Sequence, residues 1–387
     1  MRRKWVKRVI AILLTPILLF AVLMLLLYIP PVQNFLRKEA LGYASEATGM
    51  QISARRIDLR FPLNLLVSDL GVVHSSDTLL SMESLNVRVQ LLPLFSGRIE
   101  IDDFTLKSVA FNSADLIHGI ELRGVLGYFA FRSRGVNLSN QTAIIDAAEL
   151  NNTHLRLILK NDTTKTPEDS TASPRWKIDL HNLKLKNVSF SMLIPEDSVR
   201  MGAHVAEATI NGAQVDLGRE LYGLKHLHAS GTSLNYDIGS AKPTKGFDLS
   251  HIAIRELNMG LDSVLYRGRN INAAIREFSL NERSGLSITS MTGRLFANDT
   301  AIKVSSLKLK TAHSEIDFTG RTTWKLIDLP GQQGHLSMKL DALIGKQDLL
   351  LFAGKLPDAF KKEYPFRPLT IHAAAEGNLT NLNHGRL

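Results

Sequence analysis

The feature that most constrains the fold is a two-residue hydrophobic period, which begins at Gln51 and dominates the rest of the chain. In the segment SLNVRVQL, for example, Leu85, Val87 and Val89 alternate with polar residues. Such alternation places apolar side chains on one face of a strand and polar ones on the other, as in an antiparallel or single-layer sheet. An α/β fold would need a crossover helix after nearly every strand, and such helical patterns are missing. We therefore expect a mostly β protein with a few short helices.

A loose repeat recurs within this alternation, with the spacing apolar-x-apolar-x-x-apolar-x-apolar. Weaker copies begin at Ala148, Ala208 and Leu307, and the strongest copies are FTLKSVAF, LKLKNVSF and IAIRELNM. The strongest copies supply twelve residues that we predict to line one apolar face: Phe104, Leu106, Val109, Phe111, Leu183, Leu185, Val188, Phe190, Ile252, Ile254, Leu257 and Met259.

The double gap in the repeat predicts that each strand bends. Leu183 and Leu185 share a face by alternation, but Val188 would fall on the opposite face. A bend or bulge near Lys186 and Asn187 would return both apolar pairs to one side. Stacked units of this kind would build an elongated sheet in which each unit contacts only its neighbours. On the pattern alone, ordinary hairpins in a β-sandwich are an equal alternative.

The N-terminal segment, 1–29, has the pattern of a membrane anchor. Five basic residues lie within residues 1–8, and an uncharged stretch over 9–29 follows. At 1.5 Å per residue this stretch spans roughly 30 Å, the thickness of the hydrocarbon core. The positive-inside rule predicts a cytoplasmic basic tail over 1–8, a transmembrane helix over 9–29 and the remaining chain on the opposite side. A cleaved signal peptide, the main alternative, would have a shorter apolar stretch and a small-x-small cleavage site.

The remaining chain divides into a short helix and a long strand-rich domain. Apolar residues fall on one helical stripe over 32–48 and Gly49 supplies a stop, so we expect a juxtamembrane helix over 30–49. Residues 50–387 then form the strand-rich domain, which ends in what looks like the middle of another repeat and is expected to be truncated.

Three segments interrupt the strands. Residues 161–175 lack apolar side chains and are rich in Thr, Ser and Pro, which predicts a flexible loop, and 239–246 is a shorter one. The pattern turns briefly helical around 357–364.

Composition excludes several classes of function. Of the formal net charge of +9, five charges belong to the N-terminal cluster, and the other basic residues are scattered singly, which argues against nucleic-acid binding. The absence of cysteine excludes disulfides, thiolate nucleophiles and Cys-ligated metals. No nucleotide-binding loop, HExxH motif or nucleophile elbow is present, so we expect neither an enzyme nor a cofactor. His226 and His228 are the best metal candidates, but no third ligand lies near them in sequence.

The order of segments resembles the N-terminal part of the AsmA-like proteins, and within them the TamB family, the inner-membrane subunit of the translocation and assembly module. The resemblance extends from the start of the chain to Phe111. After the basic start and the apolar stretch, it rests on ATGMQISARRIDLRFPLNLLVSDLGV (47–72), DTLLSMESLNVRV (77–89) and LLPLFSGRIEIDDFTLKSVAF (91–111). It implies a diderm bacterial periplasm and an elongated β-groove, shaped like a taco, with a hydrophobic interior.

The resemblance also implies a role in outer-membrane biogenesis. The leading hypothesis is a groove that conducts phospholipid between the inner and outer membranes, because acyl chains cannot cross water cheaply. The alternative is a scaffold that assists the translocation and assembly of outer-membrane proteins by pairing with their strands. The C-terminal domain thought to meet an outer-membrane barrel partner in this family has no counterpart in the sequence.

Overall fold

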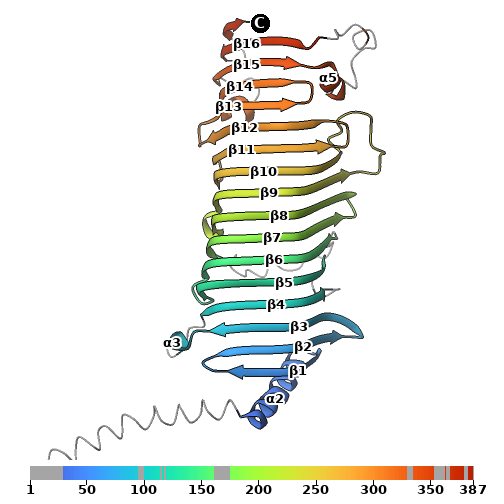
Figure 1. Ribbon diagram of the computed structural model, residues 1–387, viewed down its shortest axis with the longest axis vertical. Helices are drawn as coiled ribbons and strands as arrows, with labels where there is room; N and C mark the ends of the chain where they lie inside the picture. The colour runs from blue at the N-terminus through green and yellow to red at the C-terminus, as the bar shows by residue number, and fades with distance from the viewer. Residues whose placement is uncertain are drawn as a thin grey trace, which may run out of the picture.

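The computed structural model describes residues 29–94, 100–113, 116, 119–160, 175–328, 334–352, 362, 367–378 and 382–386. These residues form one elongated sheet of seventeen strands, stacked along the long axis of the molecule (Figure 1). The expectation of a mostly β protein with few short helices is confirmed. The predicted transmembrane helix lies outside the described residues except for Ile29, and no described helix is long and apolar enough to cross a membrane.

The strands lengthen towards the middle of the sheet and shorten again towards its C-terminal end. Their bounds are β1 Gln51–Arg60, β2 Asn64–His74, β3 Asp77–Val89, β4 Ile101–Asn112, β5 Ile120–Asn137, β6 Thr142–Leu159, β7 Lys177–Ile194, β8 Val199–Asp216, β9 Leu221–Ile238, β10 His251–Arg267, β11 Asn270–Glu282, β12 Ser287–Ala297, β13 Ala301–Thr311, β14 Glu315–Thr323, β15 Leu336–Ile344, β16 Leu369–Gly377 and β17 Leu382–Arg386.

Each strand pairs with its neighbours in the sequence. Every pairing is antiparallel except that of β6 with β7, which is parallel. A parallel pair needs a connection that returns to the starting end of the sheet, whereas antiparallel strands need only a hairpin. The connection between Lys160 and Arg175 therefore runs from the C-terminal end of β6 back to the side of the sheet where β6 began. The flexible loop predicted over 161–175 lies outside the described residues except for Arg175.

The helix predicted near the N-terminus forms as α2 (Pro30–Thr48) and ends at Gly49, whose φ is 68°. It runs beside β1, the first strand of the sheet (Figure 1). Gln33 Nε2 donates to the Leu59 carbonyl at 2.8 Å, and Ser45 Oγ accepts from the Ile52 N–H at 3.1 Å. Side chains of α2 thus occupy backbone groups of an edge strand, which protects that edge from pairing with another chain.

The other helices are short: α3 (Leu91–Leu94), the 3₁₀ helix η1 (Leu217–Arg219), α4 (Trp324–Asp328) and α5 (Lys346–Phe352). The sequence did not indicate α5, and the helical turn predicted over 357–364 lies outside the described residues except for residue 362. Residues 239–246 contain no strand, as expected. The Phe247 N–H donates to the Leu351 carbonyl at 2.8 Å, which ties this loop to α5.

The expected bend is present at Asn187, whose φ is 53°. Strand β7 keeps its register with β6 and β8 there, so the strand bends without a β-bulge. A left-handed residue occupies the same position in the other strong copies of the repeat, at Ser108 and Glu256. Together with three residues of neighbouring strands these form one line across the sheet, which we call the bend line: Asp69, Ser108, Asn152, Asn187, Gly231 and Glu256. Asn187 Nδ2 donates to Asn152 Oδ1 at 2.8 Å along this line, and register shifts occur beside it in β10.

Gly127 lies in the bend line between two of these residues. By the register of β4, β5 and β6 it faces Ser108 on one side and Asn152 on the other. A Cβ at Gly127 would lie 2.9 Å from both the Cβ and the carbonyl oxygen of Asn152. Because no side chain fits at that distance, glycine is required where the backbones approach.

No second layer of secondary structure covers the described sheet, since each strand packs extensively only against its sheet neighbours. Half of the fully buried apolar residues are alanines, and the one side chain below 2% exposure is Thr153. A sandwich core would bury large aliphatic side chains completely. The described sheet is therefore a single bent layer rather than a β-sandwich.

Candidate functional site

The strand register places the first eight predicted residues in four rows that cross the sheet. Phe104 faces Phe131, which faces Ala148, which faces Leu183; the row of Leu106 reaches Leu185 in the same way. The corresponding row from Val109 leads to Val188, and that from Phe111 leads to Phe190. Directly paired residues of neighbouring strands project from the same face, so all eight lie on one side of the sheet.

The other four predicted residues lie on the same face. Leu185 faces Ala208, Ala208 faces Ala229 and Ala229 faces Met259. Equivalent rows place Ile252, Ile254 and Leu257 opposite Tyr236, Leu234 and Thr232. Because β10 runs antiparallel to β4 and β7, its copy of the repeat crosses the rows in the reverse order.

This face is almost free of charge from β1 to β16. Apart from Asp77, which faces His74 at a hairpin turn, the one charged side chain among its described paired residues is Glu282, in the row of Ile254. Glu282 accepts the Ser284 N–H at 2.7 Å and the Ala253 N–H at 3.1 Å. Burial opposes ionisation of Glu282, but these hydrogen bonds outweigh it and lower the pKa. Backbone N–H groups at the end of the strand thus stabilise the carboxylate of Glu282.

Burial shows that the apolar face is the inner side of the bend. Val109 is 6% exposed, Thr153 1% and Leu257 5%, although no described element packs over them. The adjacent bend-line residues Ser108 and Asn152 are exposed on the other side. Side chains on the concave side of a fold crowd one another, whereas those on the convex side spread apart. The apolar face is therefore concave along the bend line.

Aromatic rings gather at one place on this face, on β4 and β5. The rings of Phe104 and Phe131 stack with centroids 5.2 Å apart, and Phe129 lies 6.0 Å from Phe104 and 5.9 Å from Phe131. On β8 and β9 the row of Phe129 holds Ala208 and Ala229, whereas the row of Phe104 and Phe131 holds Ile210 and Leu227. The apolar face therefore carries bulky rings on β4 and β5 and aliphatic side chains of mixed size on β8 and β9.

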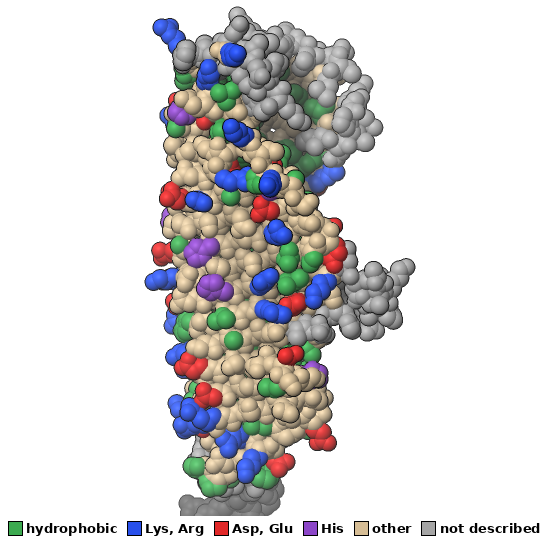
Figure 2. Space-filling view, turned by 90° about the vertical axis from the view of Figure 1, so that its right-hand side faces the viewer, with side chains coloured by type: hydrophobic (Ala, Val, Ile, Leu, Met, Phe, Trp, Pro, Cys, Tyr) green, Lys and Arg blue, Asp and Glu red, His purple; other side chains and the backbone are tan. Residues whose placement is uncertain are grey.

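The opposite face is polar and its charges are largely matched across strands. Figure 2, which views the molecule from the strand ends, shows acidic, basic and histidine side chains along one long side of the surface. Arg88 faces Asp103 and binds it at 2.8 Å, and Lys310 binds Glu315 at 2.9 Å. Pairs this exposed contribute about 0–1 kcal/mol each, so they favour register and solubility more than stability.

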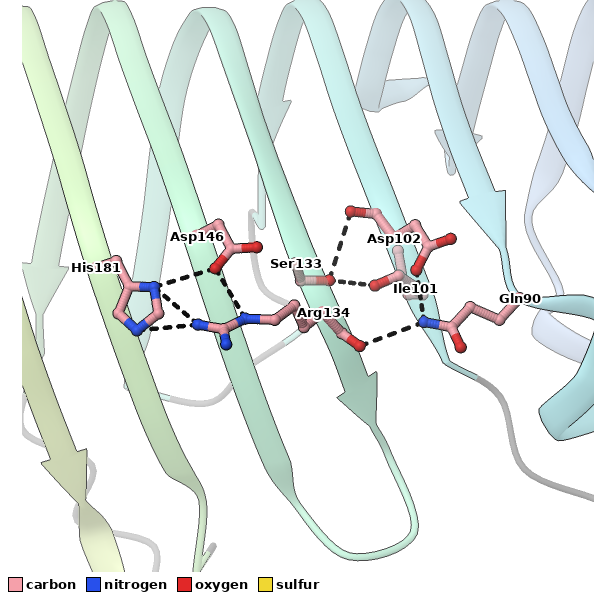
Figure 3. A network of polar contacts seen from close by, with 7 residues as sticks. All are labelled: Gln90, Ile101, Asp102, Ser133, Arg134, Asp146 and His181. Atoms are coloured by element: carbon pink, nitrogen blue, oxygen red, sulfur yellow. Dashed lines mark hydrogen bonds and ion pairs between the residues drawn. The ribbon is translucent and has the colours of Figure 1, made fainter.

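The most extended polar network joins the strands on both sides of the parallel pairing (Figure 3). Arg134 and His181 each bind Asp146 Oδ1 at 3.0 Å. Gln90 Nε2 bridges Asp102 Oδ1 at 2.5 Å and the Arg134 carbonyl at 3.3 Å.

A histidine–aspartate pair of this kind could orient a catalytic serine. Ser133, the hydroxyl of the network, instead donates to the carbonyl oxygen of Ile101, and His181 is half exposed. The network therefore joins four elements, Gln90 with β4, β5, β6 and β7, and presents no activated nucleophile.

The two histidines singled out in the sequence bind carboxylates rather than each other. His226 Nδ1 lies 2.8 Å from Asp262, and His228 Nδ1 lies 3.0 Å from Glu277. The hydrogen bond with His226, together with the nearby Arg276, holds the pKa of Asp262 below its ordinary value. Within the described part of the chain no three His, Asp or Glu side chains are grouped so that they could hold a metal ion.

Comparison of the chain with models of known protein families gives no match, and none of the curated proteins matches it. Among the structural observations, the concave apolar face therefore carries the functional argument.

Proposed function

We propose that the chain is an inner-membrane-anchored periplasmic protein of outer-membrane biogenesis, and that its concave apolar face is a groove that conducts phospholipid. The observation that supports this most is the nearly charge-free face across sixteen consecutive strands, over which the described residues place no further layer. Exposed apolar surface of this extent marks an interaction site in a soluble domain. The resemblance of the segment before β5 to the N-terminal part of the TamB family supports the same proposal.

The dimensions and energetics fit acyl chains. Fifteen strand intervals of about 4.8 Å make the face roughly 70 Å long, far longer than one lipid. Each methylene exposed to water costs about 0.8 kcal/mol, so a 16-carbon chain costs on the order of 12 kcal/mol. A continuous apolar face removes that cost at every position, while the head group stays in water. No sequence-specific pocket is needed.

Photo-crosslinking tests this function. A photo-reactive amino acid at Leu185 or Ile254, on the apolar face, is expected to capture phospholipid in cells. The matched controls are Lys184 and Arg255, the neighbouring residues on the polar face, which are expected to capture none. Equal lipid adducts on both faces would refute the conduit.

Substitution of the same residues tests whether the face must stay apolar. Leu185→Asp and Ile254→Asp would place a carboxylate in the path of the acyl chain, which would draw in water or take up a proton. We expect fewer lipid adducts on the apolar face beyond the substituted residue. We also expect an envelope defect in cells that express the full-length protein with the substitution. Leu185→Met keeps the volume and is expected to be nearly silent. Normal envelope function with Asp at both positions would contradict the proposal.

The alternative function, a scaffold for outer-membrane protein assembly, would use a free strand edge. Side chains of α2 occupy the backbone of β1, so augmentation at that edge is disfavoured. The crosslinking experiment separates the two functions, because a scaffold predicts protein adducts at strand edges and little lipid on the apolar face.

A further inference from the structure

Opposed charges on the polar face of β13 and β14 are matched at one end of the strands. Lys308 faces Asp317 and lies 3.7 Å from it, and Lys310 faces Glu315 at 2.9 Å. Opposite charges placed directly across two strands stabilise their register, and like charges destabilise it. At this end of β13 and β14, each cation on the polar face therefore has a carboxylate directly opposite it.

At the other end, Lys303 and Arg321 face each other directly. Both side chains are exposed, and no carboxylate of the described residues forms an ion pair with either. A second pair of directly opposed cations, Arg123 and Arg156, differs because Glu121 binds Arg123 at 2.5 Å. The repulsion between Lys303 and Arg321 is thus not offset within the described chain.

An exposed aromatic ring and a third cation adjoin this pair. Phe296 faces Lys303 across β12 and β13 and is 50% exposed. Arg294 lies two residues before Phe296 on the same face, exposed and without an ion pair among the described residues. We call Arg294, Phe296, Lys303 and Arg321 the basic patch. In the row of Lys303 and Arg321 the nearest carboxylate is Glu376, two strands beyond Arg321. In the row of Arg294 it is Asp262, two strands away and bound to Arg276.

A hollow of about 580 Å³ borders the basic patch on the same face. Its lining includes Arg294, Ser305 and Ser306. Arg276 and Asp262 also line it and bind each other at 3.3 Å. The hollow forms where β12 and β13 lose register beside Gly293. It offers space for a side chain next to the unmatched cations.

We propose that the basic patch is the docking surface for an acidic segment of a partner protein, whose carboxylates bind Lys303, Arg321 and Arg294 while an apolar side chain packs against Phe296. A contact between two copies through this patch would bring cations against cations, because a two-fold interface uses the same surface twice. A broad anionic bilayer would also meet the carboxylates of Asp317 and Glu315 on the same strands. A narrow acidic segment reaches the cations without that repulsion, and an exposed aromatic ring beside arginine is typical of the residues that dominate protein interfaces.

Binding to a defined acidic peptide tests the proposal. The probe is a fluorescein-labelled twelve-residue peptide of alternating Glu and Leu, and its binding to the detergent-solubilised full chain is followed by fluorescence anisotropy. We expect the double variant Lys303→Ala/Arg321→Ala to raise Kd at least tenfold. The matched control Lys308→Ala/Lys310→Ala removes the same net charge from the same strand pair and is expected to change Kd less than twofold.

Two further measurements distinguish an acidic protein segment from an anionic membrane as the ligand of the basic patch. Phe296→Ala is expected to weaken the Glu–Leu peptide at least threefold and to leave a Glu–Ser peptide unchanged. Vesicles of phosphatidylcholine and phosphatidylglycerol, mixed two to one, are expected not to compete with the peptide. Equal Kd for the two double variants, or vesicle binding that is lost with Lys303→Ala/Arg321→Ala, would overturn the proposal. Circular dichroism spectra check that each variant folds.

Discussion

Two regions of the sheet use the same bent strand with different lengths. In the long-strand region, β5 to β9 have 18 residues each and β10 has 17. In the short-strand region, β12 and β13 have 11 residues and β14 to β16 have 9. On β7 eight side chains from Ile178 to Ile194 project from the apolar face, whereas β14 offers four positions, two of them Gly320 and Thr322.

The long strands also bend twice. Besides the bend line, Gly212 and Ser263 have φ of 63° and 53°, and the register places both beside Lys225 of β9. In the short-strand region one non-glycine strand residue with positive φ is described, Ser306 with φ of 52°. From this difference we infer that left-handed residues determine where the sheet bends. Strand length determines how much apolar surface lies on the inner side of each bend.

The largest expected effect is a charge at the centre of the long-strand region. Leu257 is 5% exposed, so Leu257→Asp would bury a carboxylate without a partner and is expected to cost about 4 kcal/mol. Ile316 of the short-strand region is half-buried, and Ile316→Asp is expected to cost about 1–2 kcal/mol. Urea unfolding of the purified variants measures both values, and equal costs would mean that the two regions enclose their apolar faces equally well.

Crowding in the bend line gives the next effect. Gly127→Ala places a Cβ 2.9 Å from Asn152 and is expected to destabilise by about 2–3 kcal/mol. Gly293→Ala in the short-strand region meets Leu307 Cα at 3.0 Å and is expected to cost about 1–2 kcal/mol. Gly42 in α2 has open space around its Cβ position, so Gly42→Ala is expected to stabilise by about 0.5–1 kcal/mol. Thermal unfolding ranks the three, and a neutral Gly127→Ala would remove the steric account of the bend.

Acid should affect one loop of the long-strand region. Asp248, in the loop between β9 and β10, accepts the Thr244 and Ser250 N–H groups at 3.0 Å and also binds His251. The hydrogen bond from Thr244 is the main cause that lowers the pKa of Asp248 from 3.8 to about 2. The carboxylate therefore stabilises the loop above about pH 4, and this contribution is lost as pH falls through 2.

Amide hydrogen exchange at Ser250 measures this loss, and exchange there is expected to accelerate between pH 4 and pH 2 beyond the intrinsic change. Asp248→Asn removes the ionisable group and should abolish the additional acceleration. An unchanged profile in Asp248→Asn would assign the effect to another carboxylate.

The smallest effect is expected from a matched surface pair. Lys310 and Glu315 are both more than half exposed. A double-mutant cycle with Lys310→Ala and Glu315→Ala should give a coupling of about 0.2–1 kcal/mol that decreases at high salt. A larger coupling would show that ion pairs hold the short-strand region together in place of buried apolar surface.

Local features of this fold were predictable from the sequence, whereas long-range ones were not. The spacing around Lys186 and Asn187 predicts the bend, because alternation fails there by one residue. The helical stripe before Gly49 predicts α2 for the same local reason. The parallel pairing of β6 with β7 leaves no mark on alternation, and seven residues are too few for α5 to show a clear helical period.

The candidate site divides in the same way. The repeat identifies twelve residues that the register brings to one face, and a period-two pattern is sufficient for that. Phe129 and Phe131 join this face through pairing with Leu106 and Phe104, but they lie outside the repeat copies that we recognised. The opposition of Lys303 and Arg321 depends on the register between two strands, and the bulge at Ser306 shifts that register.

The pairing of each strand with its sequence neighbours has a consequence for how the chain can fold. Strand β1 meets β2 across a three-residue turn, and each later antiparallel strand adds to a sheet that already exists. Such a sheet can grow in the order in which the chain is synthesised, with a short loop to close at most steps. The step from β6 to β7 differs, because the connecting segment must return along the length of the strands before the first residue of β7 can pair. We expect this step to be the slowest in assembly, and the strands before it to protect their amides earlier than those after it.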